Sequence, residues 1–198
     1  MLIKTLMSDQ PLQLNITLGA NTPINAVTEV NSIQITKQSG KHDEALISFR
    51  LHQFENNKTI TGQFEMGGAI KIELGYNAPL LVAVFEGMIT SFGIQADTAG
   101  ANTYTIKAVA GNINLTHTVP NEPTLKYTFG NNLLAMDFTC GQNQETTGNI
   151  MVEGSADITI GELLQISATE SFADRLWIIT GLMHQVSKGN WLTKVYLS

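Results

Sequence analysis

The chain has 198 residues, of which 43% are hydrophobic and 14% are charged, and its net charge at pH 7 is −6. This length suits one large domain or two small ones, and the acidic balance without a basic stripe argues against nucleic acid as a partner. Charged residues are scarcer than the roughly one quarter usual in soluble domains, so we expect partner proteins to cover much of the surface. The only cysteine, Cys140, excludes an internal disulfide, and we expect it to be a small buried hydrophobic residue.

Alternating apolar and polar residues predict strands throughout the first half. The alternation is clearest over residues 12–18, where leucine and isoleucine alternate with polar side chains. Turn signals recur about every 8–12 residues, which is typical of a small barrel or sandwich. The further strands predicted by the same pattern are 30–36, 45–51, 70–74, 80–89 and 102–109.

A proline-containing segment, residues 118–123, separates this region from the rest of the chain. We therefore predict two domains, a first β-barrel over 1–118 and a second over 119–198. Strands are expected at 125–129, 133–140 and 149–153. Apolar residues within 160–172 lie near helical spacing, so a short helix is an alternative to the strand that we favour over 161–167. The predicted fold class is all-β, with minor α content possible.

A short passage of the first half recurs in the second. In the first copy, Gly68 opens an apolar strand, and a later strand carries Gly87 near its middle. In the second copy, Gly161 opens the strand and Gly181 lies within the later one. Two copies of one β unit suggest two similar, pseudo-symmetric barrels in tandem.

No motif for catalysis or metal binding is present in the sequence. There is no Gly-x-Ser-x-Gly elbow, phosphate-binding loop or dinucleotide fingerprint, and acidic residues near turns, such as Asp43 and Glu162, are expected to be solvated. The histidines are far apart and none has a metal-ligand spacing; they are His42, His52, His117 and His184. We therefore expect a protein that is not an enzyme and has no catalytic residues, metal or cofactor.

The residues that stand out have structural explanations. Glycine in mid-strand, as at Gly87 and Gly181, marks a bulge or a close backbone approach, with contact to a ligand as the alternative. His184 and Trp191 lie on either side of a tight turn over 187–190, so we expect a cross-strand packing pair. The alternative for this pair is a role in an interface.

The segment that contains His184 and Trp191 resembles a known protein family. Residues 181–193 resemble the closing motif of VgrG-type proteins, in which Gly-hydrophobic-Arg-His precedes Gly-x-Trp-x-Thr. Two earlier segments, 68–89 and 127–138, resemble further passages of that family in the same order, and the similarity spans residues 12–198. The departures are Met183 in place of arginine, Lys194 where aspartate is common, and no Pro-Gly before the first copy. The family-motif residues are Gly68, Gly87, Gly181, His184, Gly189, Trp191 and Thr193.

This resemblance implies a structural tail-hub protein of a contractile phage or injection particle. The hub would be a homotrimer whose six tube-type barrels adapt a hexameric tail-tube protein to a threefold spike. The chain ends where a VgrG protein would continue into its needle, so we expect the spike to be a separate protein and the remaining partners to be baseplate proteins.

The start of the chain lacks the features of a signal peptide, and no apolar run reaches the ~18 residues of a spanning helix. We therefore expect synthesis in the cytoplasm, assembly into the particle and no insertion into a membrane. Two alternatives are a tube or baseplate ring of another symmetry and a monomeric, ligand-binding β-barrel.

Overall fold

The computed structural model describes residues 11–19, 22–23, 28–51, 64–76, 81–96, 102–114, 122–141, 146–167, 175–187 and 189–198. These residues contain strands and no helix, so the predicted all-β class is confirmed. Residues 163–167 form a strand, as favoured over a helix. Because the described part of the chain is free of helices, it contains none that could cross a membrane.

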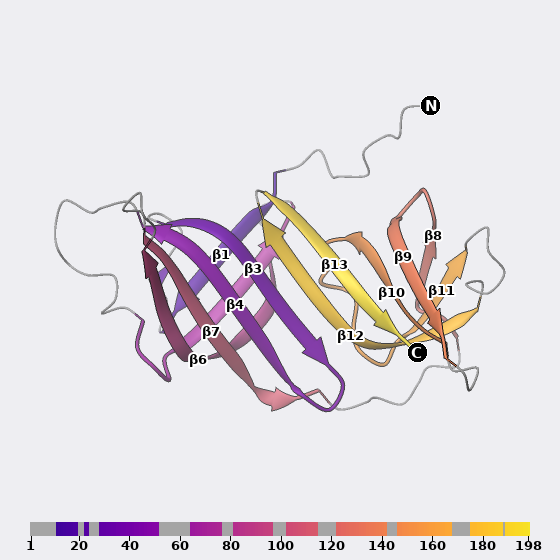
Figure 1. Ribbon diagram of the computed structural model, residues 1–198, viewed down its shortest axis with the longest axis horizontal. Coiled ribbons are helices and arrows are strands. Elements are labelled where there is room, and N and C mark those ends of the chain that lie inside the picture. The colour runs from indigo at the N-terminus through magenta and orange to yellow at the C-terminus, as the bar shows by residue number, and fades with distance from the viewer. Residues whose placement is uncertain are drawn as a thin grey trace.

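The strands are labelled in Figure 1 where space permits. They are β1 (Gln13–Leu18), β2 (Thr22–Pro23), β3 (Thr28–Gln38), β4 (His42–Leu51), β5 (Ala69–Gly75), β6 (Val82–Ala96), β7 (Asn102–Ile113), β8 (Leu125–Thr128), β9 (Leu133–Cys140), β10 (Thr146–Glu153), β11 (Leu163–Ser167), β12 (Leu176–Ser187) and β13 (Asn190–Leu197).

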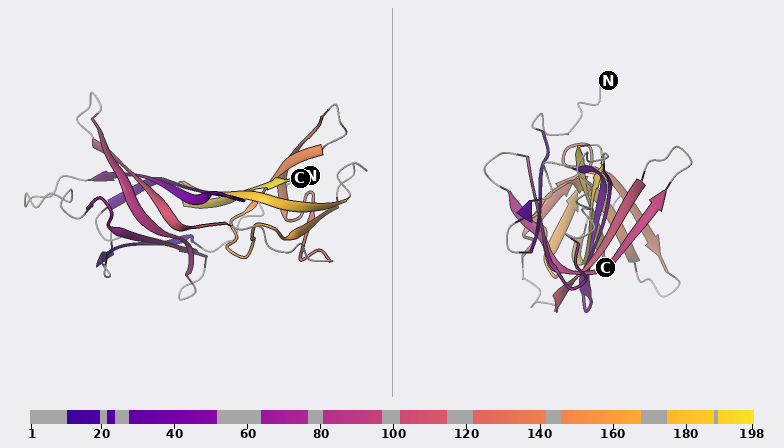
Figure 2. Two further views of the ribbon diagram at one scale, coloured as in Figure 1. Left: turned by 90° about the horizontal axis from the view of Figure 1, so that it is seen from below. Right: turned by 90° about the vertical axis from the view of Figure 1, so that its left-hand side faces the viewer.

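The strands belong to one 13-stranded sheet that runs through both halves of the chain. Its order is β2-β1-β5-β6-β7-β4-β3-β12-β13-β10-β9, while β11 pairs with β12 and β8. The halves meet where β3 lies beside β12 (Figure 1). The left-hand view in Figure 2 shows the strand layer passing through the middle of the molecule and opening into a curled group of strands at each end.

Two clusters of buried apolar side chains fill the two curled groups. The first is built mainly from β1 and β3–β7 and includes Ile35, Ile47 and Ile72, while the second is built from β9–β13 and includes Ile150 and Trp177. Val186 and Trp191, which come from the last two strands, are buried in the first cluster. The C-terminal hairpin therefore completes the core of the N-terminal half.

The strand order of the first half recurs in the second. The series β1-β5-β6-β7-β4-β3 corresponds to β8-β11-β12-β13-β10-β9, although β1 is antiparallel to its neighbour and β8 is parallel. A glycine with positive φ precedes β5 and β11, Gly67 at 80° and Gly161 at 89°. Each donates its N–H to an isoleucine carbonyl, that of Ile89 or Ile179, at 2.8 Å. In both copies the isoleucine N–H returns a hydrogen bond to the residue after the glycine.

Two bulges also recur at matching positions. Pairing with the next strand skips Thr90 in β6 and Thr180 in β12. The two threonine hydroxyls donate to the cross-strand carbonyls of Lys107 and Tyr196, both at 3.2 Å. Pairing with the hairpin partner likewise skips Asn31 in β3 and Leu134 in β9. These features fix which residues of the two halves correspond.

The structural correspondence corrects the alignment read from the sequence. Gly161 matches Gly67, one residue before Gly68. Gly87 faces Ile70 across β5 and β6, and the residue at that place in the second half is Trp177, whereas Gly181 follows the bulge. The two mid-strand glycines are therefore not equivalent, because the hairpin loops differ in length.

Two further expectations were wrong. Cys140 is exposed at the end of β9, where the described residues pair with this strand only on the β10 side. Asp43 is not a solvated turn charge: it lies in β4, accepts a hydrogen bond from Asn114 Nδ2 and pairs with Lys37 Nζ at 3.5 Å. Most of the expected boundary over 118–123 lies outside the described residues.

Candidate assembly site at the junction of the two halves

The long strand β12 forms the junction by changing partners along its length. Residues 176–178 pair with β11, and residues 181–187 pair antiparallel with β3 from the other half. On its opposite side β12 pairs with β13 from Ile179 to Ser187, with a bulge at Thr180. The backbone hydrogen bonds of one strand thus join both halves in a single ladder.

Trp191 is the side chain that packs at the centre of this junction and stabilises it. It is 4% exposed, and its ring stacks on that of Tyr76 with the centroids 5.9 Å apart. The Tyr76 hydroxyl donates to the Trp191 carbonyl at 3.1 Å, and Gly154 N–H donates to the same oxygen at 2.9 Å. A Cβ on Gly154 would lie 2.1 Å from the indole ring, so this glycine provides the space that Trp191 occupies.

His184 and Thr193 form a buried polar pair next to Trp191. The His184 and Thr193 side chains are directly opposite in β12 and β13, and Nδ1 lies 2.9 Å from Oγ1. Trp191 Nε1–H, which can only donate, points to the same Nδ1 at 3.4 Å. Nδ1 must therefore be an acceptor, which places the proton of the neutral ring on Nε2. The T-shaped contact between His184 and Trp191 confirms the packing pair expected from the sequence.

The environment keeps this histidine neutral. Burial, together with the positive charge of Lys37, lowers the pKa of His184 from 6.5 to about 4. Protonation of Nδ1 would remove the acceptor that serves both Trp191 and Thr193. The pair is thus suited to structural support rather than to proton transfer near neutral pH.

The remaining family-motif residues are glycines at separate places. A Cβ on Gly87 would lie 2.6 Å from the Val109 carbonyl oxygen, and one on Gly181 would lie 3.0 Å from that of Lys37. Close backbone approach, one of the two structural reasons expected for these glycines, is observed at both, and Gly181 also follows the bulge at Thr180. Gly189 has φ 78° in the turn of the C-terminal hairpin, and Gly68 lies in the turn before β5. The structure brings together only His184, Trp191 and Thr193, with Gly181 and Gly189 in the same hairpin.

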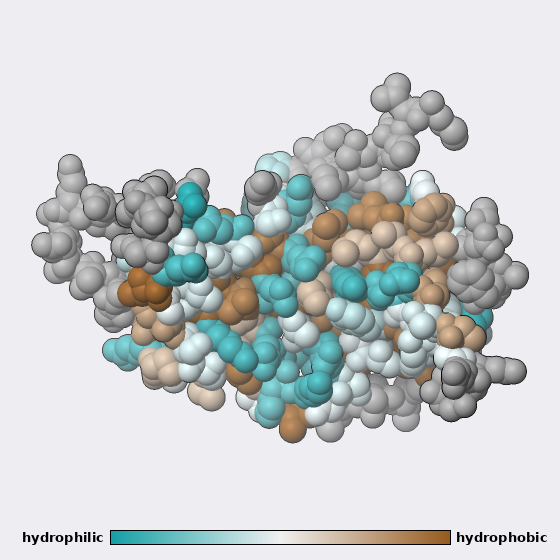
Figure 3. Space-filling view, in the orientation of Figure 1, coloured by the Kyte–Doolittle hydropathy of each residue, from teal (hydrophilic) through white to brown (hydrophobic). Residues whose placement is uncertain are grey.

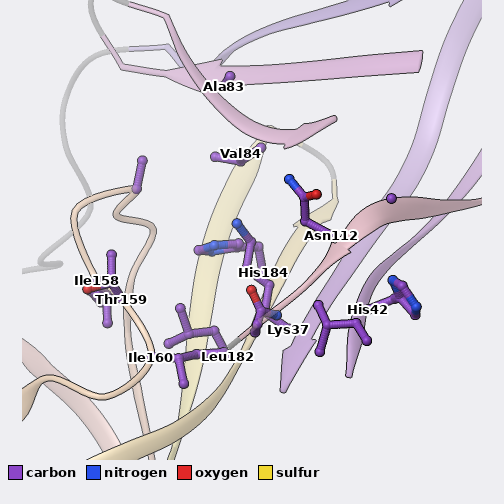
Figure 4. A pocket seen from close by; sticks show the side chains of 14 residues that line it. Lys37, His42, Ala83, Val84, Asn112, Ile158, Thr159, Ile160, Leu182 and His184 are labelled. Atoms are coloured by element: carbon purple, nitrogen blue, oxygen red, sulfur yellow. The ribbon is translucent and has the colours of Figure 1, made fainter. Parts of the chain in front are cut away.

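A cavity of about 840 Å³ lies beneath the junction. Figure 4 shows Leu182 and His184 projecting into it from β12, facing Val84 across the space, with Ile158 and Ile160 along one side. Its polar side chains are those of lysine, histidine, asparagine and threonine, and the described residues hold no cluster of three potential metal ligands. The cavity is lined by residues of both halves, including Val84 from the first core cluster and Leu182 from the second.

The sheet surface opposite the cores is predominantly polar. Residues that alternate with the buried ones on β3 and β4 are serine, threonine, glutamine and charged side chains, apart from Leu46. Lys107 Nζ pairs with Glu44 across two strands at 3.0 Å. In Figure 3, hydrophilic and intermediate side chains cover most of the described part of this face.

Sequence reasoning missed four residues that define the junction and the repeat: Tyr76, Gly154, Thr90 and Thr180. The Ile-Thr pairs at 89–90 and 179–180 were visible in the sequence and would have given the correct alignment. No local pattern pointed to Gly154 or Tyr76, because each acts through Trp191, which is distant in sequence.

Comparisons with known proteins show what this fold is. No family model matches the chain, and no curated protein matches it in sequence. Among solved structures, the tail protein from Neisseria meningitidis MC58 matches with a TM-score of 0.64 at 9% identity, over 94% of this chain and 96% of that one. The chain has the fold of a tail protein.

Two other solved structures extend this likeness to secretion systems. The E. coli c3393 protein, a type VI secretion component described as similar to the T4 tail proteins gp27 and gp5, matches with a TM-score of 0.61 at 7% identity, over 92% of this chain and 76% of that one. A Francisella PdpA–VgrG complex matches with a TM-score of 0.58 at 6% identity, over 98% of this chain and 53% of the matched one. The resemblance to VgrG-type proteins thus extends to the fold.

Proposed function

We propose that this chain is a structural hub protein of a contractile tail or injection particle. The observation that carries the proposal is the end-to-end likeness to a tail protein, which extends over 94% of this chain. The correspondence of strands and bulges between the halves supports the division into two similar barrels, with a boundary near residue 118.

In this proposal the hub is a trimer of two-barrel chains. Three chains present six similar barrels to a hexameric tube protein, while the assembly itself is threefold and suits a separate spike protein. The polar face of β3 and β4 would line the lumen, and the buried junction would transmit force between barrels. Baseplate proteins would cover the outer surface. The chain would act through assembly, without catalysis or a cofactor.

The mass of the purified assembly tests this proposal. Light scattering at tens of micromolar should give three times the 21.5 kDa chain mass, and images of the particle should show threefold symmetry with six similar lobes. A hexameric or larger ring would favour the tube or baseplate alternative. A monomer that binds an apolar ligand in the cavity would favour the alternative of a monomeric, ligand-binding β-barrel.

A further inference from the structure

The internal junction supplies a template for a contact between chains. Residues 181–187 of β12 and residues 32–38 of β3 form seven consecutive antiparallel pairs, from Gly181↔Gln38 to Ser187↔Ser32. The pairing buries its inner face: His184 is 2% exposed and its partner Ile35 is 0% exposed.

The first half contains a second copy of the β12 edge. Ser91 follows the bulged Thr90 as Gly181 follows Thr180, so residues 91–96 of β6 correspond to residues 181–186. Residues 91–96 pair with β7 on one side. On the other side, β5 pairs only with residues 82–88, and no described strand pairs with 91–96.

The second half contains a second copy of the β3 edge. Ala135 follows the skipped Leu134 as Ser32 follows Asn31, so residues 135–141 correspond to residues 32–38. β9 ends the order of the described sheet, with β10 on its other side. Asp137, Thr139 and Cys140 on this strand are exposed.

Exposure along the β6 edge differs from that of its paired counterpart. Ile94, the counterpart of His184, is 56% exposed, whereas His184 is 2% exposed. An open strand edge beside an exposed apolar side chain is a template for pairing with another chain. The molecule thus has two complementary strand edges that correspond to the pair already joined within the chain.

We propose that residues 91–96 of β6 pair antiparallel with residues 136–141 of β9 in a second copy of this chain. The register is that of the internal pair, which places Phe92 opposite Cys140, Gly93 opposite Thr139 and Gln95 opposite Asp137. β6 and β9 lie toward opposite ends of the molecule (Figure 1), so the contact is head-to-tail and generates a ring when the rotation closes. That the ring contains three chains rests on the proposed hub function.

Disulfide trapping in the assembled full-length protein tests the register. Cys140 is the only cysteine, and directly opposed residues of antiparallel strands are close enough for a disulfide. Phe92→Cys should therefore link neighbouring chains covalently upon mild oxidation. Phe92 stacks on Phe64 at 5.3 Å, and its loss could impair folding. The second design, Gln95→Cys with Asp137→Cys and Cys140→Ser, changes only exposed positions.

Gln95→Cys with Cys140 retained is the matched control. These two positions lie three residues apart along the ladder and on opposite faces of the sheet, so linkage should be lost. Efficient linkage of the 95/137 design but not of this control supports the proposed pairing. Equal linkage of both, or linkage of neither, overturns it.

A charge at the edge provides an independent measurement. Ile94→Lys should shift the mass from the assembly to the monomer, whereas Val82→Lys should leave the assembly intact, because Val82 lies on the part of β6 already paired with β5 and is similarly exposed at 49%. An assembly that survives Ile94→Lys overturns the edge pairing.

The outcomes separate this inference from the proposed function. A trimer in which the 95/137 design gives no linkage overturns the pairing and leaves the hub proposal in place. Linked chains that close at a number other than three support the pairing and overturn the trimer. A protein that stays monomeric at tens of micromolar overturns both.

Discussion

At the scale of single residues, the buried polar pair beside Trp191 couples stability to pH. His184 accepts hydrogen bonds through Nδ1 only while its ring is neutral, and its surroundings lower its pKa to about 4. The unfolded chain binds a proton near the ordinary value of 6.5, so acid favours the unfolded state.

We therefore predict a loss of stability between pH 6.5 and pH 4 that depends on His184. The free energy of unfolding should fall by about 3 kcal/mol over this range, since each pKa unit corresponds to about 1.4 kcal/mol. Urea denaturation at several pH values should show this fall in the wild type. A His184→Gln variant should be less stable at pH 7 and should lose less stability on acidification. The same loss in both proteins would contradict the assigned role.

At the scale of elements, glycine allows strands to approach where the sheet curls. Gly87 lies where a side chain would meet the Val109 backbone and the Phe85 ring, at 2.6 and 2.7 Å. Gly93, later on the same strand, has only the Thr105 oxygen within reach, at 4.0 Å. The two glycines lie on the same strand but differ in the room available for a side chain.

This difference predicts unequal effects of adding one methyl group. Gly87→Ala should destabilise the protein by about 1–3 kcal/mol, because neither neighbour can move without disturbing β7 or the core. Gly93→Ala should be neutral or slightly stabilising, since strand propensity improves without a clash. Thermal unfolding of the two variants measures the contrast, and similar melting temperatures would exclude the steric explanation.

The alternation of apolar and polar residues locates individual strands but does not reveal which strands pair. Alternation located the strands around Ile72, Ile106 and Ile150, because each has one buried face. It did not find the pairing of β3 with β12, since strands more than 140 positions apart leave no local signal of their contact. Because the hairpin loops differ in length, the sequence alignment wrongly matched Gly87 with Gly181. The bulges at Thr90 and Thr180 give the correct correspondence.

At the scale of the whole molecule, the halves share a sheet, and the second half contributes side chains to the core of the first. Trp191 is buried in the first core and Trp177 in the second, and these are the only tryptophans of the chain. The β3–β12 ladder and the packing of Trp191 against Tyr76 bind the two cores together.

We predict that both cores unfold in a single transition. Trp191→Phe leaves Trp177 as the fluorescent reporter of the second core, and Trp177→Phe leaves Trp191 as the reporter of the first. In each variant the fluorescence transition in urea should coincide with loss of the β-sheet circular dichroism signal. Fluorescence and circular dichroism midpoints that separate in Trp177→Phe, which keeps Trp191 at the junction, would show that the halves unfold independently.

The sequence by itself determined the all-β class, the strand positions, the presence of a repeated unit and the packing of His184 with Trp191. These follow from alternation, from turn residues and from neighbours along one hairpin, all of which act within a few residues. Only the tertiary structure decided that one sheet joins the halves, that Trp191 enters the opposite core, and that Cys140 is exposed at a strand end that pairs only with β10 within the described residues. Those outcomes depend on which strands meet after folding, and contacts between distant segments are selected by shape and burial over the whole chain.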